Sequence, residues 1–298
     1  MLNWLQSYRE RGWHPVDEKT YATAWHKFGG SVITHPEFVS RLSQLVDRPP
    51  RYLGYFSGDQ LLGSVATWGR FLALSRKALK QMGKRHLFDL GNAEVILPLQ
   101  RDVYIPFRFD ATYLSEQNLN TLKALRRQKE SIALLRDPND FGKKFLYNQR
   151  RELRLFEERG GMAQPIQSCS PEELASTYRR LFELRWGFAT PAGTALEQVF
   201  SLLHPYMTGS LLCMDGLPVA IQILYRVEAP EWISIEYING GVDPAFQSLS
   251  PGSVLTFINT QAALRDASER HKPLRYSFGR ADRDYKMRWC RAVPVFRT

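Results

Sequence analysis

The chain has 298 residues, of which 44% are hydrophobic and 12% aromatic. This content is sufficient for a sizeable core and excludes a largely disordered chain. Its 40 Lys and Arg residues exceed its 30 Asp and Glu residues, giving a net charge of +10. This excess predicts an anionic partner: nucleic acid, anionic lipid or a phosphorylated substrate.

Cysteine and histidine usage argues against disulfides and metal. The three cysteines, Cys169, Cys213 and Cys290, lie far apart, and the six histidines follow no zinc-binding spacing. We therefore expect a protein of a reducing compartment with no metal site. The first residues contain no apolar signal segment, and no uncharged stretch consists of about twenty apolar residues. These features predict a cytoplasmic protein that does not span a membrane.

The N-terminal half is predicted to begin with a helix at 15–28, because Tyr21, Trp25 and Phe28 recur at helical spacing. A hairpin is expected at 52–68, with its turn at 57–59. Two extended segments follow, at 93–98 and 103–109.

The remainder of the chain alternates between predicted helices and strands. Helices are expected at 118–136 and 143–159, and the capping pattern Ser-Pro-Glu-Glu starts another at 170 that runs to about 186. A second hairpin with an Asp-Gly turn is expected at 210–227, followed by a strand at 231–238, a helix from 250 to about 269, and short strands at 274–279 and 293–296.

The two hairpins resemble each other, and a helix precedes each. We interpret this as a weak internal duplication, while noting that unrelated hairpins share the same pattern. The predicted fold is α/β (α+β), with two tandem units of mixed sheet flanked by helices. The predicted units are 1–140 and 141–298, and the second carries the candidate site.

Charge is distributed unevenly. Residues 123–159 carry a net charge of +5 and residues 265–298 carry +6, whereas 160–264 carry −5. Within the first segment Arg150, Arg151 and Arg154 lie largely off the apolar face of the predicted helix. This arrangement suits the backbone of a polyanion such as tRNA, although a solvated basic face is the ordinary alternative.

Residues 279–289 form the densest candidate site. Arg280 and Lys286 are interleaved with Asp282, and Tyr285 and Trp289 flank them. Such a loop can stabilise an oxyanion or hold a phosphate through its cations, while a carboxylate orients the lysine or accepts a proton. A structural ion-pair network is the alternative.

The predicted helix that opens with Ser250-Pro-Gly-Ser253 offers backbone N–H groups to a phosphate or an oxyanion, with Gly252 allowing close approach. Simple helix capping is the competing explanation. The chain contains no G-x-S-x-G, H-E-x-x-H, P-loop or G-x-G-x-x-G motif. Direct transfer of an activated acyl group therefore fits better than covalent catalysis.

Seven motifs make the chain resemble, nearly end to end, the Mig-fourteen family of antimicrobial-peptide-resistance proteins: 28–36, 160–161, 169–174, 182–187, 239–242, 249–255 and 285–289. The C-terminal half also resembles the GNAT acyltransferases that include the Fem-type peptidyltransferases. That resemblance rests on Gly216-Leu-Pro-Val-Ala, Ser250-Pro-Gly and Gly279…Tyr285-Lys286.

The resemblance implies a double-GNAT enzyme that takes an aminoacyl group from aminoacyl-tRNA. Its acceptor would be a sugar amine or hydroxyl of lipopolysaccharide or another envelope precursor, at the inner face of the membrane, which allows peripheral membrane contact. On this hypothesis the catalytic residues are Lys286, Asp282 and Tyr285. Donor binding is assigned to Ser250, Gly252, Ser253, Arg280, Arg150, Arg151 and Arg154, and acceptor binding to Glu236, Tyr237, Arg185 and Trp186.

Two alternatives remain open, and no tightly bound cofactor is expected in any of them. The same fold could use acetyl-CoA, although Pro251 removes one of the N–H groups that a pyrophosphate needs. The chain could also be a non-catalytic module that binds an anionic membrane or a peptide, although capture of cationic peptides conflicts with its net charge of +10.

Overall fold

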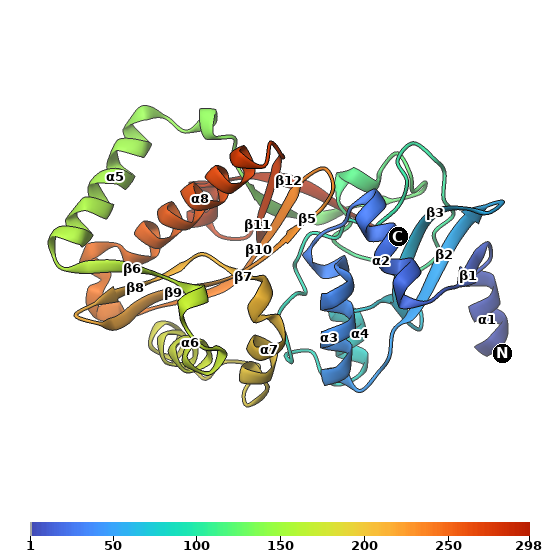
Figure 1. Cartoon of the computed structure of the whole chain (residues 1–298), viewed down its shortest axis with the longest axis horizontal. Helices are drawn as coiled ribbons and strands as arrows, with labels where there is room; N and C mark the ends of the chain where they lie inside the picture. The colour runs from blue at the N-terminus through green and yellow to red at the C-terminus, as the bar shows by residue number, and fades with distance from the viewer. Residues whose placement is uncertain (1) are drawn as a thin grey trace. The chain divides into compact units, whose positions relative to one another are not determined.

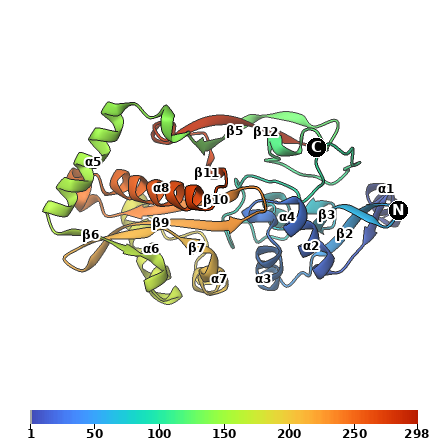
Figure 2. The ribbon, with the colours of Figure 1, turned by 45° about the horizontal axis from the view of Figure 1, so that its top comes forward.

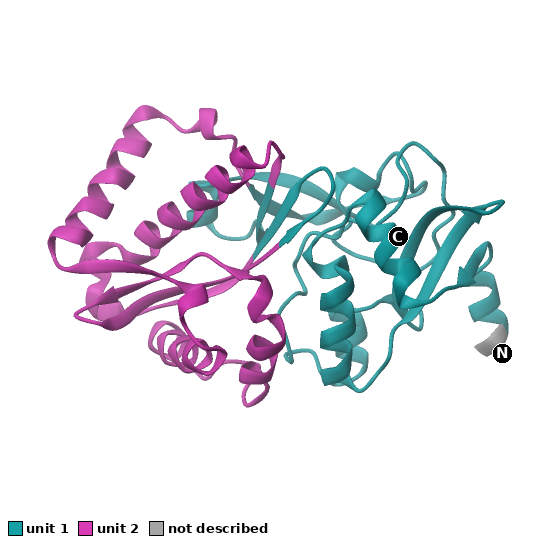
Figure 3. Ribbon diagram, in the orientation of Figure 1, with its two compact units in different colours: residues 1–134, 227–236, 275–298 teal, residues 135–226, 237–274 magenta. Residues whose placement is uncertain are grey.

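The structure, a computed structural model, describes residues 2–298 and has the mixed α/β fold that the sequence predicts (Figure 1). Two compact units compose it: unit 1 contains residues 1–134, 227–236 and 275–298, and unit 2 contains residues 135–226 and 237–274 (Figure 3). The last 24 residues thus belong to the same unit as the first 134. Since compactness does not test for a repeat, the two GNAT-like units at 1–140 and 141–298 remain a prediction.

Five α-helices and seven strands lie wholly or mostly in the described part of unit 1. The helices are α1 (Leu2–Arg9), α2 (Glu18–Phe28), α3 (Pro36–Val46), α4 (Arg76–Gln81) and α9 (Asp284–Met287). The strands are β1 (Trp13–Pro15), β2 (Arg51–Ser57), β3 (Gln60–Trp68), β4 (Phe71–Leu72), β5 (Arg126–Leu135), β11 (Leu274–Arg280) and β12 (Cys290–Arg297). Helices α1, α3, α4 and α9 and the short strands β1 and β4 were not predicted.

The predicted first hairpin is confirmed as β2 and β3, the centre of an antiparallel sheet with the order β1-β2-β3-β4. Helix α2 packs on β2 and β3 and buries Tyr21 and Trp25, as its spacing predicts. Asp17 caps α2 by accepting a hydrogen bond from the Thr20 N–H. The segments at 93–98 and 103–109 form no regular strand; the first contributes an isolated bridge between Val95 and Leu114.

The prediction of a helix at 118–136 is wrong, because most of this segment is strand β5. Strands β12, β5, β11 and the start of β10 (Ile233–Val242) follow one another in the sheet. Ile132 and Leu134 of β5 are buried against Val293 and Val295 of β12. Pairing with strands distant in sequence thus determines the structure of this segment, and the prediction from the local sequence misses it.

Unit 2 contains four helices and the remaining strands. The helices are α5 (Lys143–Glu158), α6 (Pro171–Trp186), α7 (Ala195–Leu203) and α8 (Pro251–Glu269). The strands are β6 (Gly161–Pro165), β7 (Met207–Thr208), β8 (Ser210–Met214), β9 (Leu217–Glu228) and β10, and the last residues of β9 and the first of β10 belong to unit 1. Apart from α7 and the short β6 and β7, these elements agree with the predicted ones.

The strands of unit 2 follow the order β10-β9-β8-β6, with α5 and α8 on one side of the sheet and α6 and α7 on the other (Figures 1 and 2). Phe156 of α5 and Val254 and Leu255 of α8 form one core cluster with Leu212 and Ala220 of the sheet. The capping box predicted at the start of α6 is present, since Ser170 and Glu173 exchange hydrogen bonds of 3.2 and 2.7 Å.

Among residues 2–298, no helix has both the length and the apolar composition needed to cross a bilayer.

The packing of β10 on α6 predicts a strict requirement for glycine at position 241. A Cβ atom at Gly241 would lie 2.6 Å from the carbonyl carbon of Leu181 and 2.7 Å from the nitrogen of Phe182. Because backbone cannot yield as a flexible side chain does, Gly241→Ala should lower the free energy of unfolding by roughly 1–3 kcal/mol. Urea denaturation measures this change. The control is Gly252→Ala, whose Cβ would meet no atom closer than 3.6 Å; equal stability of the two variants would contradict the packing argument.

Candidate active site

The end of strand β11 presents the candidate catalytic loop. The pairing of β11 with β5 shifts register between Ser277 and Arg280, and Gly279 has a left-handed φ of +69° beside Asn92. Glycine adopts this conformation at low cost, so the chain turns out of the sheet here. The turn leads to the short helix α9, which carries Tyr285 and Lys286.

Lys286, Asp282 and Arg280, which the sequence analysis grouped, do meet. The Lys286 Nζ donates a hydrogen bond of 2.7 Å to the Arg280 carbonyl oxygen and lies 3.3 Å from Asp282 Oδ1. The Arg280 guanidinium donates from two nitrogens to Asp282 Oδ2, at 2.9 and 3.0 Å. The Lys286 side chain is only 12% exposed. The loop therefore holds the Lys286 ammonium group in a fixed and largely buried position.

The ionisation of the cluster follows from this geometry. Burial lowers the pKa of Lys286, and the Asp282 charge opposes that effect. Burial would raise the pKa of Asp282, but the hydrogen bond from Arg280 and the charge of Lys286 outweigh it and lower the pKa. The hydrogen bond to Asp282 raises the pKa of Arg280. Asp282 is thus held as a carboxylate, which suits an orienting group better than a strong base.

Two tyrosines belong to this region. Tyr285, a predicted catalytic residue, is 42% exposed on α9. Tyr113 was not predicted; burial raises its pKa, and the charges of Glu130, Arg280 and Asp282 also act on its phenol. Nothing in the sequence around Tyr113 signals this proximity, because the residue precedes the loop by more than 160 positions.

A buried ionic network lies at the other end of β11. Arg275 donates from Nε to Glu94 Oε2 at 2.9 Å, and its Nη2 contacts Glu94 Oε1. Glu236 Oε1 accepts a 2.8 Å hydrogen bond from the Glu94 N–H, and both glutamates are 1% exposed. Burial and the Glu94 charge raise the pKa of Glu236 well above its ordinary value. The burial of Glu236 favours a structural role. That Glu236 binds the acceptor remains a prediction.

The predicted donor-binding residues at the start of α8 lie in unit 2. Ser250 occupies the N-cap position, but its left-handed backbone (φ 50°) accompanies no side-chain cap. The Ser253 hydroxyl instead donates to Gln149 Oε1 of α5 at 2.8 Å. Simple capping by these serine side chains therefore does not explain this sequence. The N–H groups of Ser253 and Val254 donate to the Ser250 carbonyl at 2.9 and 3.0 Å, so among the first residues of α8 Gly252 is the one whose N–H could face a ligand.

The other predicted residues of unit 2 lie on two helices and on β10. Arg150, Arg151 and Arg154 are exposed on α5, on the side away from Phe156. Arg185 donates to the Gly240 carbonyl at 3.0 Å and stacks over Trp186, with 4.7 Å between the guanidinium carbon and the ring centre. Tyr237 of β10, by contrast, is buried. Arg185 thus has a structural partner, whereas Trp186 is 40% exposed.

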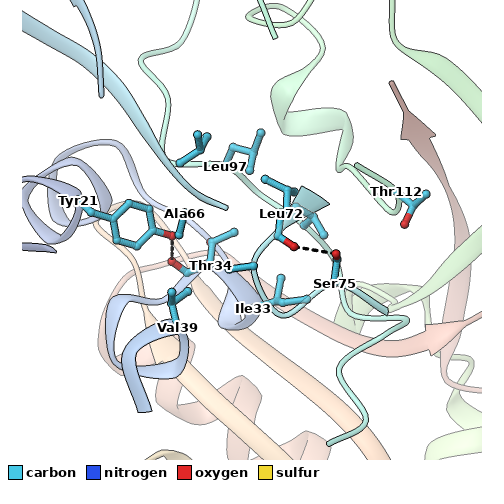
Figure 4. A pocket seen from close by; sticks show the side chains of 12 residues that line it. Tyr21, Ile33, Thr34, Val39, Ala66, Leu72, Ser75, Leu97 and Thr112 are labelled. Atoms are coloured by element: carbon cyan, nitrogen blue, oxygen red, sulfur yellow. Dashed lines mark hydrogen bonds between the residues drawn. The ribbon is translucent and has the colours of Figure 1, made fainter. Parts of the chain in front are cut away.

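A small cavity between α2, α3 and β3 is a packing void and not a substrate site. Its volume is about 20 Å³, enough for roughly one water molecule. Figure 4 shows the Tyr21 hydroxyl donating to the Thr34 carbonyl at 2.6 Å and the Ser75 hydroxyl donating to the Leu72 carbonyl at 2.7 Å beside it. Within the described part of the chain, no three His, Cys, Asp or Glu side chains gather as metal ligands would.

Comparison with known proteins identifies a family and a fold. The Mig-14 family model matches residues 35–298. The crystal structure of FemX superposes with a TM-score of 0.55 and 10% identity, covering 96% of each chain. The C-terminal domain of a protein named as a lysylphosphatidylglycerol synthetase, from Agrobacterium fabrum, gives a TM-score of 0.51 and 14% identity over 94% of this chain and 92% of that one. No curated protein matches in sequence.

The buried network predicts a pH-dependent stability difference. In the folded protein Glu236 keeps its proton at pH values where the unfolded chain, with an ordinary pKa of 4.5, releases it. Folding is therefore progressively opposed as the pH rises above 4.5, by about 1.4 kcal/mol per unit at most. The variant Glu236→Gln lacks this proton and still accepts from the Glu94 N–H.

Urea denaturation of both proteins between pH 4.5 and 8 measures the difference. The variant should gain stability relative to the wild type as the pH rises. A difference that stays constant with pH would show that Glu236 is not held protonated.

Proposed function

The chain belongs to the Mig-14 family, and we propose that it is a GNAT/Fem-type acyltransferase that modifies the cell envelope. The donor is aminoacyl-tRNA, and the acceptor is a sugar amine or hydroxyl of lipopolysaccharide or an envelope precursor. The FemX-like fold supports this activity, as does the likeness to a protein named for a lysyl group on phosphatidylglycerol. The enzyme acts in the cytoplasm, at the inner face of the membrane.

The observation that carries the proposal is the fixed ammonium group of Lys286. An ammonium has three N–H donors, and in the described chain the Arg280 carbonyl and Asp282 engage two of them. The third is available to a carbonyl oxygen of the substrate. Because the group is already oriented and largely dry, it stabilises a developing oxyanion without reorganising.

The transfer follows from this placement. The acceptor nitrogen or oxygen attacks the carbonyl carbon of the aminoacyl ester, and the negative charge that forms on the carbonyl oxygen faces Lys286. The intermediate collapses as the bond to the ribose oxygen of tRNA breaks, and the tRNA leaves as its hydroxyl with the acceptor's proton. The product is an amide or an ester of the envelope sugar. Asp282 and Arg280 position Lys286, and Tyr285 is proposed to contact the substrate.

The donor is proposed to contact two places in unit 2. They are the start of α8, with Ser250, Gly252 and Ser253, and the exposed arginines of α5, which are proposed to contact the tRNA backbone. Pro251 at the first position of α8 lacks an N–H, which makes this helix start a poor cradle for the pyrophosphate of acetyl-CoA.

The residues proposed for the acceptor are Glu236, Tyr237, Arg185 and Trp186. Glu236 and Tyr237 are buried, so Trp186, the most accessible of the four, is the one best placed to contact it. Adding an aminoacyl group introduces an ammonium to an anionic surface and so reduces its attraction for cationic peptides. Resistance to antimicrobial peptides is the proposed consequence.

Replacing the lysine tests the site. Lys286→Met keeps the length of the side chain and removes the charge, so transfer from aminoacylated tRNA to lipopolysaccharide core should fall by roughly 100-fold or more. The control is Lys80→Met, an exposed position on α4, which should retain the wild-type rate. Thermal denaturation verifies that both variants fold. A folded Lys286→Met protein with near-wild-type transfer would exclude this role for the lysine.

A further inference from the structure

A cationic cleft lies in unit 1, apart from every residue assigned above. Its volume is about 650 Å³, and five cations line it: Arg9, Arg70, Arg108, Lys123 and Arg126. These side chains come from α1, the β3–β4 turn, the segment before β5 and β5 itself. We call it the arginine cleft. Because four separate parts of the chain contribute, it is a built feature of the fold and not one basic helix face.

The charge of the cleft is not neutralised within the described chain. Asp110 is the one acidic side chain in the lining, and Lys77 already pairs with it at 2.6 Å. None of the five cations forms an ion pair with a carboxylate side chain of residues 2–298. The five positive charges repel one another, and a bound anionic ligand would relieve this repulsion.

One wall of the cleft is apolar and aromatic. Leu5, Tyr8 and Phe107 line it, and Arg108 lies over the Tyr8 ring with 5.2 Å between the guanidinium carbon and the ring centre. Tyr8 also stacks with Trp4, and these side chains are 57% and 70% exposed. An anionic ligand with a less polar portion would satisfy both the cations and this wall.

We propose that the arginine cleft binds a phosphate ester. Guanidinium groups match the oxygens of phosphate with two parallel hydrogen bonds, and several of them share the charge of one anion. The phosphate has two possible sources, the headgroup of an anionic phospholipid or a water-soluble ester. The proposal uses no residue of the transfer site, so it stands or falls independently of the proposed enzymatic activity.

Direct binding tests the cleft without any transfer reaction. The probes are glycerol 3-phosphate, measured by calorimetry, and vesicles of phosphatidylcholine with or without phosphatidylglycerol, measured by co-sedimentation. The protein should bind at least one phosphate probe, and the affinity should fall as the salt concentration rises. Binding to glycerol 3-phosphate assigns a soluble ester, and binding only to vesicles containing phosphatidylglycerol assigns a lipid headgroup.

Matched variants locate the binding. Arg70→Gln with Arg126→Gln removes two exposed cations of the cleft and should weaken binding roughly tenfold or more. The control pair, Arg127→Gln with Lys129→Gln, removes the same charge from exposed neighbours on β5 outside the lining and should bind like the wild type. Two results would overturn the proposal. One is that glycerol 3-phosphate does not bind and phosphatidylglycerol does not increase binding to vesicles. The other is an equal loss of binding in both variant pairs.

Discussion

The ion pair between Arg275 and Glu94 is the constraint on which the candidate site depends. It joins residues 181 positions apart and fastens the start of β11 inside unit 1. Burying two charges is costly, and hydrogen bonds from two guanidinium nitrogens offset that cost, while the raised pKa of Glu236 disfavours a second negative charge beside Glu94. Because one end of β11 is fixed, the turn at Gly279 defines the position of the loop that carries Lys286. Strand β11 thus connects the buried ion pair at its start to the candidate catalytic loop at its end.

Local signals in the sequence were sufficient for much of the fold. The capping box of α6, the two hairpins and the core-facing spacing of α2 each depend on residues that lie near one another in the sequence. The same holds for the grouping of Arg280, Asp282 and Lys286, because one turn and one short helix bring them together.

Contacts between distant segments could not be predicted. Strand β5 was wrongly predicted as a helix. Its burial depends on β11 and β12, which lie more than 130 residues later, so the local sequence does not reveal its partners. The sequence did not identify Glu94 or Tyr113 as members of a polar cluster, because their partners are also distant in the sequence. Glu236 was predicted as an acceptor-binding residue, and its burial emerged only from the packing around Glu94. The arginine cleft likewise gathers cations whose positions in the sequence are unremarkable.

The central claim is that the chain transfers an aminoacyl group, and the mass of its product tests this most directly. Purified protein is incubated with lipopolysaccharide core and either aminoacylated tRNA or acetyl-CoA, and the glycan is then weighed by mass spectrometry. The account predicts an increase equal to one aminoacyl residue, and only when aminoacylated tRNA is present. An acetyl increment from acetyl-CoA, or an unchanged glycan with both donors, would contradict it.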